Sequence, residues 1–225
     1  MKTTNVLKLA IPALMLISGS AFAQITGTAH DMTAASTYDN PADAGAQICV
    51  YCHTPHNATA LTSGPLWNRN LESALTFTMY NGAGAANPST TIDGVISATP
   101  NDETMACLGC HDGVSAIDNI SNLPGNDPAI TVAWNADTNS GPVVGFAVLD
   151  SDLSDDHPVS ITYSPADGGL KALATVTTAD NVKFYGTNSD SVECASCHDV
   201  HGTGIDQFLR VTSDGSLICF ECHDK

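Results

Sequence analysis

The stretch that decides the fold is ICVYCHTPHNAT, residues 48–59. It holds two cysteines separated by two residues, a histidine directly after the second cysteine, and another histidine three residues on. The Cys-x-x-Cys-His pattern occurs four times and uses all eight cysteines of the chain. In chain order, motifs 1 to 4 are Cys49-Cys52-His53, Cys107-Cys110-His111, Cys194-Cys197-His198 and Cys219-Cys222-His223.

Three chemistries use closely spaced cysteines: disulfide bonds, tetrahedral zinc and covalently attached haem. Eight cysteines allow disulfides or zinc sites, but neither explains a histidine after every second cysteine. In a c-type haem site the two thiols bind the porphyrin and the adjoining histidine is the proximal iron ligand. The sequence therefore predicts four covalent haems c on the eight cysteines, with His53, His111, His198 and His223 as proximal ligands.

Four histidines remain once the proximal ligands are assigned. They are His30, His56, His157 and His201. Four spare histidines for four irons predict bis-histidine ligation, with solvent-exposed or structural histidines as the alternative. Six-coordinate iron leaves no position for a substrate, which favours an electron-transfer protein over an enzyme. The rival ligands Met32, Met79 and Met105 are expected in the apolar core instead.

The spacing of two spare histidines predicts which haems they serve. His56 and His201 each stand three residues after a proximal histidine, and residues three apart on a helical turn share one face. Such a side chain cannot reach the far side of its own motif's iron, so it should ligate a neighbouring haem. His157 precedes Pro158, which favours extended backbone, and we expect it to be a third distal ligand.

His30 lies near the start of the mature chain, whereas motif 4 lies almost at its end. We therefore expect His30 to ligate a haem of a neighbouring copy, that of His223, with a haem of its own chain as the alternative. This head-to-tail contact would propagate as an open filament. An isolated subunit should then hold His30 far from every proximal histidine.

The first residues predict export. Residues 1–23 contain the basic MKTTNVLK, the apolar LAIPALMLISG and the small-residue end Ala21-Phe22-Ala23. This order is typical of a secretory signal peptide. We expect an extracellular or cell-surface protein, with the periplasm as the alternative. The apolar run is too short to cross a bilayer, so no membrane span is expected.

The mature chain is strongly acidic. Removal of Lys2 and Lys8 with the signal leaves five basic residues against 24 acidic ones, a net charge of −19. This charge repels phosphate backbones and anionic membrane surfaces, which excludes nucleic acid as a partner class. It also keeps copies apart, so self-assembly needs a bond stronger than ordinary surface contacts.

Residues 24–225 are expected to form one tetrahaem domain that is mostly coil. Only 6% of residues are aromatic, so a stack of haems should replace the conventional core. Short helices are predicted at the motifs, and a further one at 67–80. The motif-free segment 112–193 contains β-leaning runs bounded by turn residues. These runs are 129–134, 143–149, 159–164 and 182–186.

Several segments together resemble a known family. They are ICVYCHTPHNA (48–58), PLWNR (65–69), TMY (78–80), CLGCHDGVSAID (107–118), HPVS (157–160), CASCHDVHG (194–202) and CFECH (219–223). The chain resembles the OmcE-type extracellular tetrahaem cytochromes of metal-reducing bacteria, which polymerise into filaments. The resemblance implies stacked bis-histidine haems, an axial histidine donated across the subunit interface, and electron transfer to redox partner proteins or extracellular metal acceptors.

The resemblance carries over to the motif positions. The eight cysteines match the family's thioether sites, and His56, His157 and His201 match its distal ligands. His30 matches less specifically, because histidines in short N-terminal segments are common. Two other functions remain open: a monomeric periplasmic tetrahaem shuttle and, less favoured, a multihaem reductase.

Overall fold

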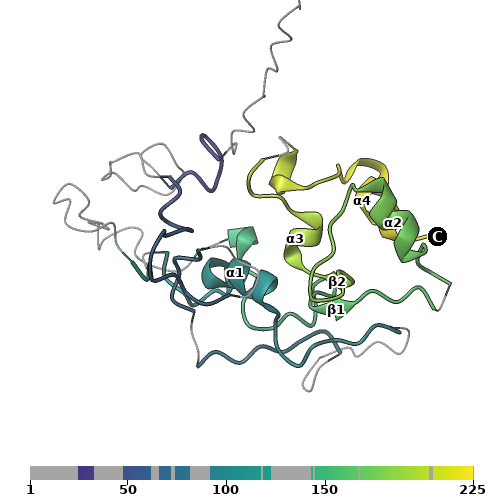
Figure 1. Ribbon diagram of the computed structural model, residues 1–225, viewed down its shortest axis with the longest axis horizontal. Coiled ribbons are helices and arrows are strands. Elements are labelled where there is room, and N and C mark those ends of the chain that lie inside the picture. Colours follow the sequence, from purple (N-terminus) through teal and green to yellow (C-terminus); the bar gives the residue numbers. More distant parts are fainter. Residues whose placement is uncertain are drawn as a thin grey trace, which may run out of the picture.

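The computed structural model describes residues 25–32, 48–61, 66–71, 74–81, 92–117, 119–122, 143, 145–166, 168–202 and 205–224. In this part the chain is mostly coil, with short helices and one two-stranded sheet (Figure 1). The predicted fold type is therefore confirmed at this coarse level. The signal segment 1–23 and the strand expected at 129–134 lie outside the described residues. No described helix has the length and apolarity to cross a bilayer.

Three helices carry haem motifs. Helix α1 (Asp102–His111) holds motif 2, α3 (Cys194–Cys197) holds motif 3 and α4 (Leu217–Cys222) holds motif 4. Helix α1 lies on one side of the molecule, and α2 and α4 lie on the other (Figure 1). Helix α3 lies between them, beside α1.

Motif 1 makes a single helical turn instead of a helix. The His53 N–H donates to the Cys49 carbonyl at 2.8 Å. The same bond closes motifs 3 and 4, at 3.1 Å from His198 to Cys194 and 2.9 Å from His223 to Cys219. These motifs therefore share one backbone turn, which brings the two cysteines and the histidine to the same side.

Helix α2 (Leu173–Ala179) contains no cysteine motif and was not predicted. It ends at Asp180, which adopts the left-handed conformation (φ 57°) that often terminates helices. Its buried Val176 packs in a cluster with Tyr163 and Val182, and the partly buried Cys222 of motif 4 packs against it. The helix therefore supports the last haem motif.

The sheet is smaller than the β-leaning runs predict. Strand β1 (Ile161–Thr162) pairs antiparallel with β2 (Ser191–Val192), so the strand expected at 159–164 is present in short form. The strand expected at 182–186 is wrong: it is replaced by turns and an isolated bridge at Tyr185.

The strand expected at 143–149 is also wrong. Its described residues form a 3-10 turn at Gly145–Ala147. Gly145 has a φ of +86°, a conformation that favours glycine and does not belong to a strand.

The helix predicted at 67–80 is wrong as well. Its described residues form isolated bridges, in which Arg69 pairs with Ile120 and Thr78 with Asp152. Arg69 instead donates its side chain to backbone carbonyls on and after α1. Tertiary contacts here override a modest helix propensity.

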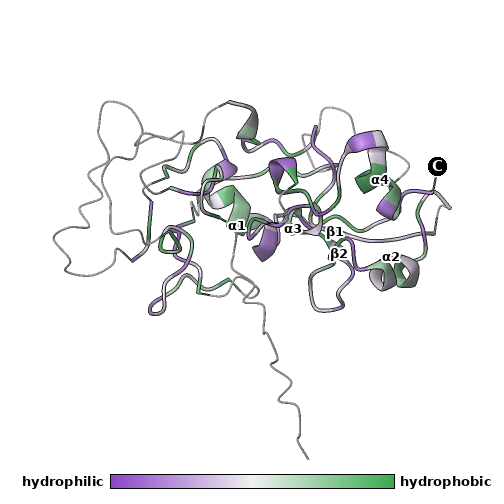
Figure 2. Cartoon of the chain, turned by 90° about the horizontal axis from the view of Figure 1, so that it is seen from above, coloured by the Kyte–Doolittle hydropathy of each residue, from purple (hydrophilic) through white to green (hydrophobic). Residues whose placement is uncertain are grey.

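Among the described residues, the apolar core is divided into three small clusters. Met32, Tyr51, Ile117, Ile120 and Val143 form the first, and Cys52 and Cys110 pack against it. The second contains Met79, Leu108 and Leu153, with Met105 beside it. Met32, Met79 and Met105 thus belong to the core, as predicted. Hydrophobic and hydrophilic residues are mixed along the described part of the chain (Figure 2).

Candidate haem-attachment sites

The cysteine side chains are suited to thioether bonds. All eight cysteines are free of disulfides. Burial raises the pKa of Cys52 to about 12 and that of Cys222 to about 11. In the described part, which includes every cysteine and histidine, three or more His, Cys, Asp or Glu side chains do not gather as a candidate metal site. Free thiols are the form in which cysteines bind the porphyrin in a c-type haem site.

Cysteines of consecutive motifs lie close to one another. Cys52 and Cys110 pack against the same apolar cluster, and Cys110 contributes to the raised pKa of Cys52. A hydrogen bond with Cys194 raises the pKa of Cys107. Burial raises the pKa of Cys197, and the nearby Cys219 adds to the effect. The four motifs therefore follow one another in space in their chain order.

The histidine rings form three pairs, and each pair contains one proximal and one spare histidine. His53 and His201 have ring centroids 6.1 Å apart, and so do His111 and His30. His223 and His157 are 6.4 Å apart. An imidazole nitrogen binds a transition metal at about 2 Å, so two rings on opposite sides of one ion have centroids roughly 6 Å apart. Each pair thus has room for one iron between its rings.

The hydrogen bonds of the rings leave one nitrogen available. Nδ1 of His111 lies 2.7 Å from the Ala147 carbonyl oxygen, and Nδ1 of His198 lies 2.8 Å from that of Gln207. Nδ1 of His157 lies 3.1 Å from the Pro158 carbonyl oxygen. Metal-binding histidines commonly donate the other ring N–H to a carbonyl, which fixes the tautomer. Nε2 then remains as the metal ligand.

The expectation that His30 lies far from every proximal histidine is wrong. Its ring stands edge-on to His111 (88°) and stacks on Phe208 at 4.6 Å. Burial, followed by the nearby His111, lowers the pKa of His30 to about 4, which leaves the neutral imidazole that metals bind. Sequence reasoning failed because chain-end position says little about where the segment folds back.

His157 faces His223 but keeps an exposed edge. Desolvation of the ring lowers its pKa below the ordinary value, and the neighbouring His223 adds to this effect. The ring is therefore neutral at neutral pH and ready to bind a metal.

Three buried polar atoms of the described residues lack a hydrogen-bond partner: His30 Nδ1, Trp67 Nε1 and Arg69 Nε. All three lie beside motifs 1 and 2. The Trp67 ring is 5.7 Å from that of His53, and Arg69 bonds to the Gly109 carbonyl between Cys107 and Cys110. Buried polar atoms are normally satisfied, so these orphans fit a bound group that carries polar atoms.

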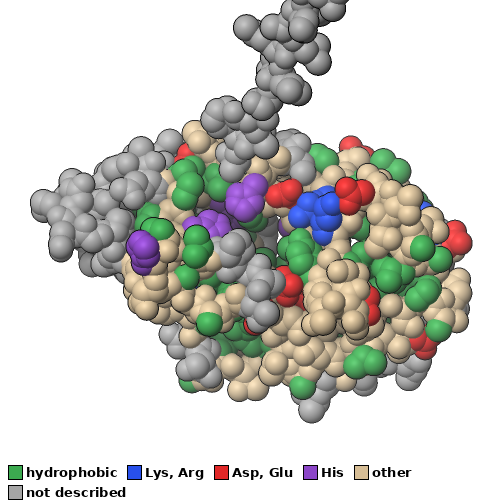
Figure 3. Space-filling view, in the orientation of Figure 1, with side chains coloured by type: hydrophobic (Ala, Val, Ile, Leu, Met, Phe, Trp, Pro, Cys, Tyr) green, Lys and Arg blue, Asp and Glu red, His purple; other side chains and the backbone are tan. Residues whose placement is uncertain are grey.

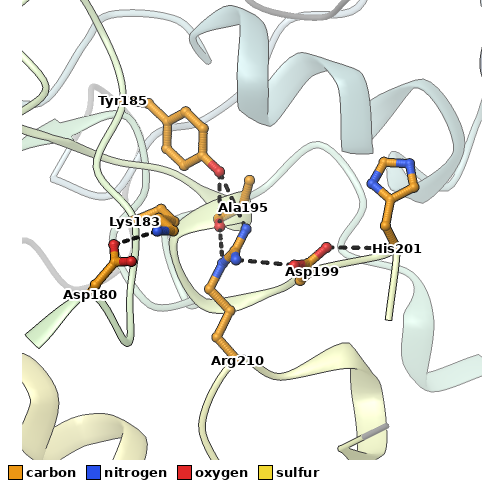
Figure 4. A network of polar contacts seen from close by, with 7 residues as sticks. All are labelled: Asp180, Lys183, Tyr185, Ala195, Asp199, His201 and Arg210. Atoms are coloured by element: carbon orange, nitrogen blue, oxygen red, sulfur yellow. Dashed lines mark hydrogen bonds and ion pairs between the residues drawn. The ribbon is translucent and has the colours of Figure 1, made fainter. Parts of the chain in front are cut away.

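A polar network positions His201 (Figure 4). The His201 N–H donates to the Asp199 carboxylate at 3.1 Å, and Asp199 pairs with Arg210 at 3.2 Å. Arg210 also donates to the Ala195 carbonyl in α3 at 2.9 Å. These bonds fix the segment after motif 3 against α3, and the His201 ring lies beside that of His53 in motif 1. Sequence reasoning missed Arg210, although the mature chain has only five basic residues.

Two histidines remain without a partner of this kind. His56 and His198 are both exposed, and neither has a ring contact with another described histidine. Histidine side chains gather at one part of the surface shown in Figure 3, near a basic side chain flanked by acidic ones. One proximal and one spare histidine thus remain outside the three ring pairs.

The comparison with known protein families agrees with these sites. Residues 188–225, which contain motifs 3 and 4, match the family described as the doubled CXXCH motif. This match indicates a multihaem c-type cytochrome with covalently bound haem c, a class that typically acts in electron transfer. No curated protein matches the chain.

Proposed function

We propose that the protein is exported, carries four bis-histidine haems c and polymerises into extracellular filaments that conduct electrons. The haems, when bound, supply the one-electron redox centres. The observation that carries the proposal is the set of three histidine pairs at 6.1–6.4 Å with one unpaired proximal histidine and one unpaired spare histidine. The residues of the chain position and bury these centres.

The two unpaired histidines, His56 and His198, supply a way to join copies. His56 of one copy and His198 of the next would complete the fourth iron site across the contact. The two sides of this contact differ, so it is heterologous and can repeat without closing. Copies that each carry a net charge of −19 repel one another, so their assembly needs a strong bond. An iron–imidazole bond is of this kind. His56 thus replaces His30 as the ligand donated to a neighbour.

We expect the mature protein to carry four haems. The reason is that all four motifs are complete and no cysteine is bonded to another. Intact mass spectrometry should give the polypeptide that starts at Gln24 plus four haem masses. A properly matured sample with three haems or fewer would contradict the count.

The variant His157→Ala should expose one iron without releasing its haem. The His157 ring faces His223, whereas Cys219 and Cys222 hold the porphyrin independently. We expect about one quarter of the iron to become high-spin or water-ligated, with an unchanged intact mass apart from the substitution. Near-infrared magnetic circular dichroism reports both the ligands and the spin state. A His/Met signature in the natural protein would count against all-histidine ligation.

The other two functions give different results. A monomeric shuttle would elute as a single subunit and show no filaments by negative-stain electron microscopy. A multihaem reductase would bind nitrite or cyanide readily at an open iron, with a change in its visible spectrum. We expect filaments and no rapid change of this kind, because bis-histidine iron has no free position.

A further inference from the structure

Two charged side chains inside the protein, Arg69 and Glu193, lie at different points along the series of motifs. Each is only 1% exposed. Neither forms an ion pair with a described residue. Taking a charge out of water is unfavourable, and buried charges of this kind act strongly on their surroundings because solvent and salt screen them little.

Arg69 lies where motif 1 meets motif 2. Its guanidinium donates to the carbonyls of Gly109 at 3.2 Å and Ala116 at 2.7 Å, while Nε has no partner. The Gly109 carbonyl lies between the two cysteines of motif 2, and Asn68, the residue before Arg69, donates its N–H to the Cys52 carbonyl of motif 1 at 2.8 Å. The cation therefore acts on the attachment sites of the first and second haems.

Glu193 lies where motif 2 meets motif 3, directly before Cys194. Its carboxylate accepts hydrogen bonds from Thr104 and Asn101 at 2.6 and 2.7 Å, and from Ser160 and Ser191 at 2.9 and 2.5 Å. All four partners are neutral donors. They stabilise a buried anion without cancelling its charge.

Other charges near the motifs do not reverse the contrast between the buried cation Arg69 and the buried anion Glu193. Asp112 is buried beside Cys110 and accepts a hydrogen bond from Ser115 at 2.6 Å, so its effect falls mainly on the second haem. Arg210 lies near Cys197 of motif 3, but its ion pair with Asp199 largely cancels its charge. The opposite charges of Arg69 and Glu193 therefore differ most in their effect on the first and third haems.

We propose that Arg69 and Glu193 act as fixed opposite charges that hold the reduction potential of the first haem above that of the third. A nearby cation stabilises the electron gained on reduction, and a nearby anion destabilises it. Electrons would then reside on the first haem before the third. The proposal rests on the proposed set of four haems, whose number the mass measurement tests separately.

The ring geometry provides a spectroscopic label for the first haem. His53 and His201 are nearly parallel (21°), whereas the pairs at His111 and His223 are close to perpendicular (88° and 82°). Parallel and perpendicular imidazole planes on low-spin iron give different electron paramagnetic resonance spectra. A redox titration followed by this method therefore separates the first haem from the second and fourth.

The test compares Arg69→Met and Glu193→Gln with the natural haem-loaded protein. Arg69→Met should decrease the reduced-to-oxidised ratio of the parallel-ring signal at least tenfold at fixed potential, a shift of about 59 mV downwards. Glu193→Gln should raise the midpoint potential of a component other than the parallel-ring signal by a similar amount, about 59 mV. Gln fits the same site because the surrounding hydroxyls can reverse their hydrogen bonds.

Two controls separate charge from structure. Arg69→Lys keeps the positive charge and should keep the midpoint of the parallel-ring signal close to its natural value. Asp180→Asn removes a charge that is 73% exposed and should shift no midpoint measurably. An unchanged parallel-ring midpoint in correctly loaded Arg69→Met protein, or no upward shift in Glu193→Gln, would overturn the proposal.

Discussion

Replacement of His56 with Ala is expected to abolish filaments while leaving a folded subunit with all its haems. His56 is exposed and has no ring contact with another described histidine, so its loss removes nothing from the three intrachain pairs. It would remove the bond that completes the iron site of His198 in the next copy. Electron microscopy should show no filaments, and size-exclusion chromatography should give single subunits.

The matched control is His30→Ala. It also removes one axial ligand, but from the intrachain pair with His111, so filaments should persist. Added imidazole should restore a low-spin spectrum to His56→Ala protein without restoring filaments, because free imidazole cannot link two copies. Normal filaments in His56→Ala protein, or their loss only in His30→Ala, would refute the assignment of His56 to the interface.

The cysteine motifs made much of this site predictable from the sequence. Covalent attachment requires a fixed local spacing, so the positions of the thiols and proximal histidines follow from neighbouring residues alone. The match of residues 188–225 to a doubled-motif family agrees with this local prediction. The coil-rich fold followed as well, since few aromatic residues and frequent turn residues leave little for regular elements.

The pairing of distal with proximal histidines was harder to predict from the sequence, because it depends on contacts between distant segments. His30 was assigned to a neighbouring copy from its place near the chain end, yet it packs against Phe208 and faces His111. The helix predicted at 67–80 failed for the same kind of reason, since Arg69 is held by carbonyls 40 and 47 residues away. Neither contact leaves a periodic signal in the sequence.

Glu193 was also missed. Its importance comes from four hydrogen-bond donors elsewhere in the chain, including Asn101 and Thr104 at the start of α1. A single acidic residue among 24 gives no sequence signal of burial. Only the packing of α1 against α3 shows that this carboxylate stands between two haem motifs.

The haems are expected to be necessary for folding, because the described part of the polypeptide lacks elements that are stable alone. Helices α3 and α4 have four and six residues, and the strands have two residues each. Isolated helices shorter than about 12 residues are marginal in water, and so are two-stranded sheets. The apolar clusters are small, and cysteine side chains adjoin two of them.

A mature-length chain with all eight cysteines changed to Ser should therefore remain unfolded. We expect a coil-like far-ultraviolet circular dichroism spectrum, poor dispersion of amide proton signals and no cooperative transition in urea, in contrast to the haem-loaded natural protein. A graded control replaces only Cys219 and Cys222 with Ser. This variant should lose order around Val176, whose cluster adjoins Cys222, while amides of α1 stay protected from hydrogen exchange. Cooperative unfolding of the cysteine-free chain would show that the polypeptide core suffices and that the haems are not required to build it.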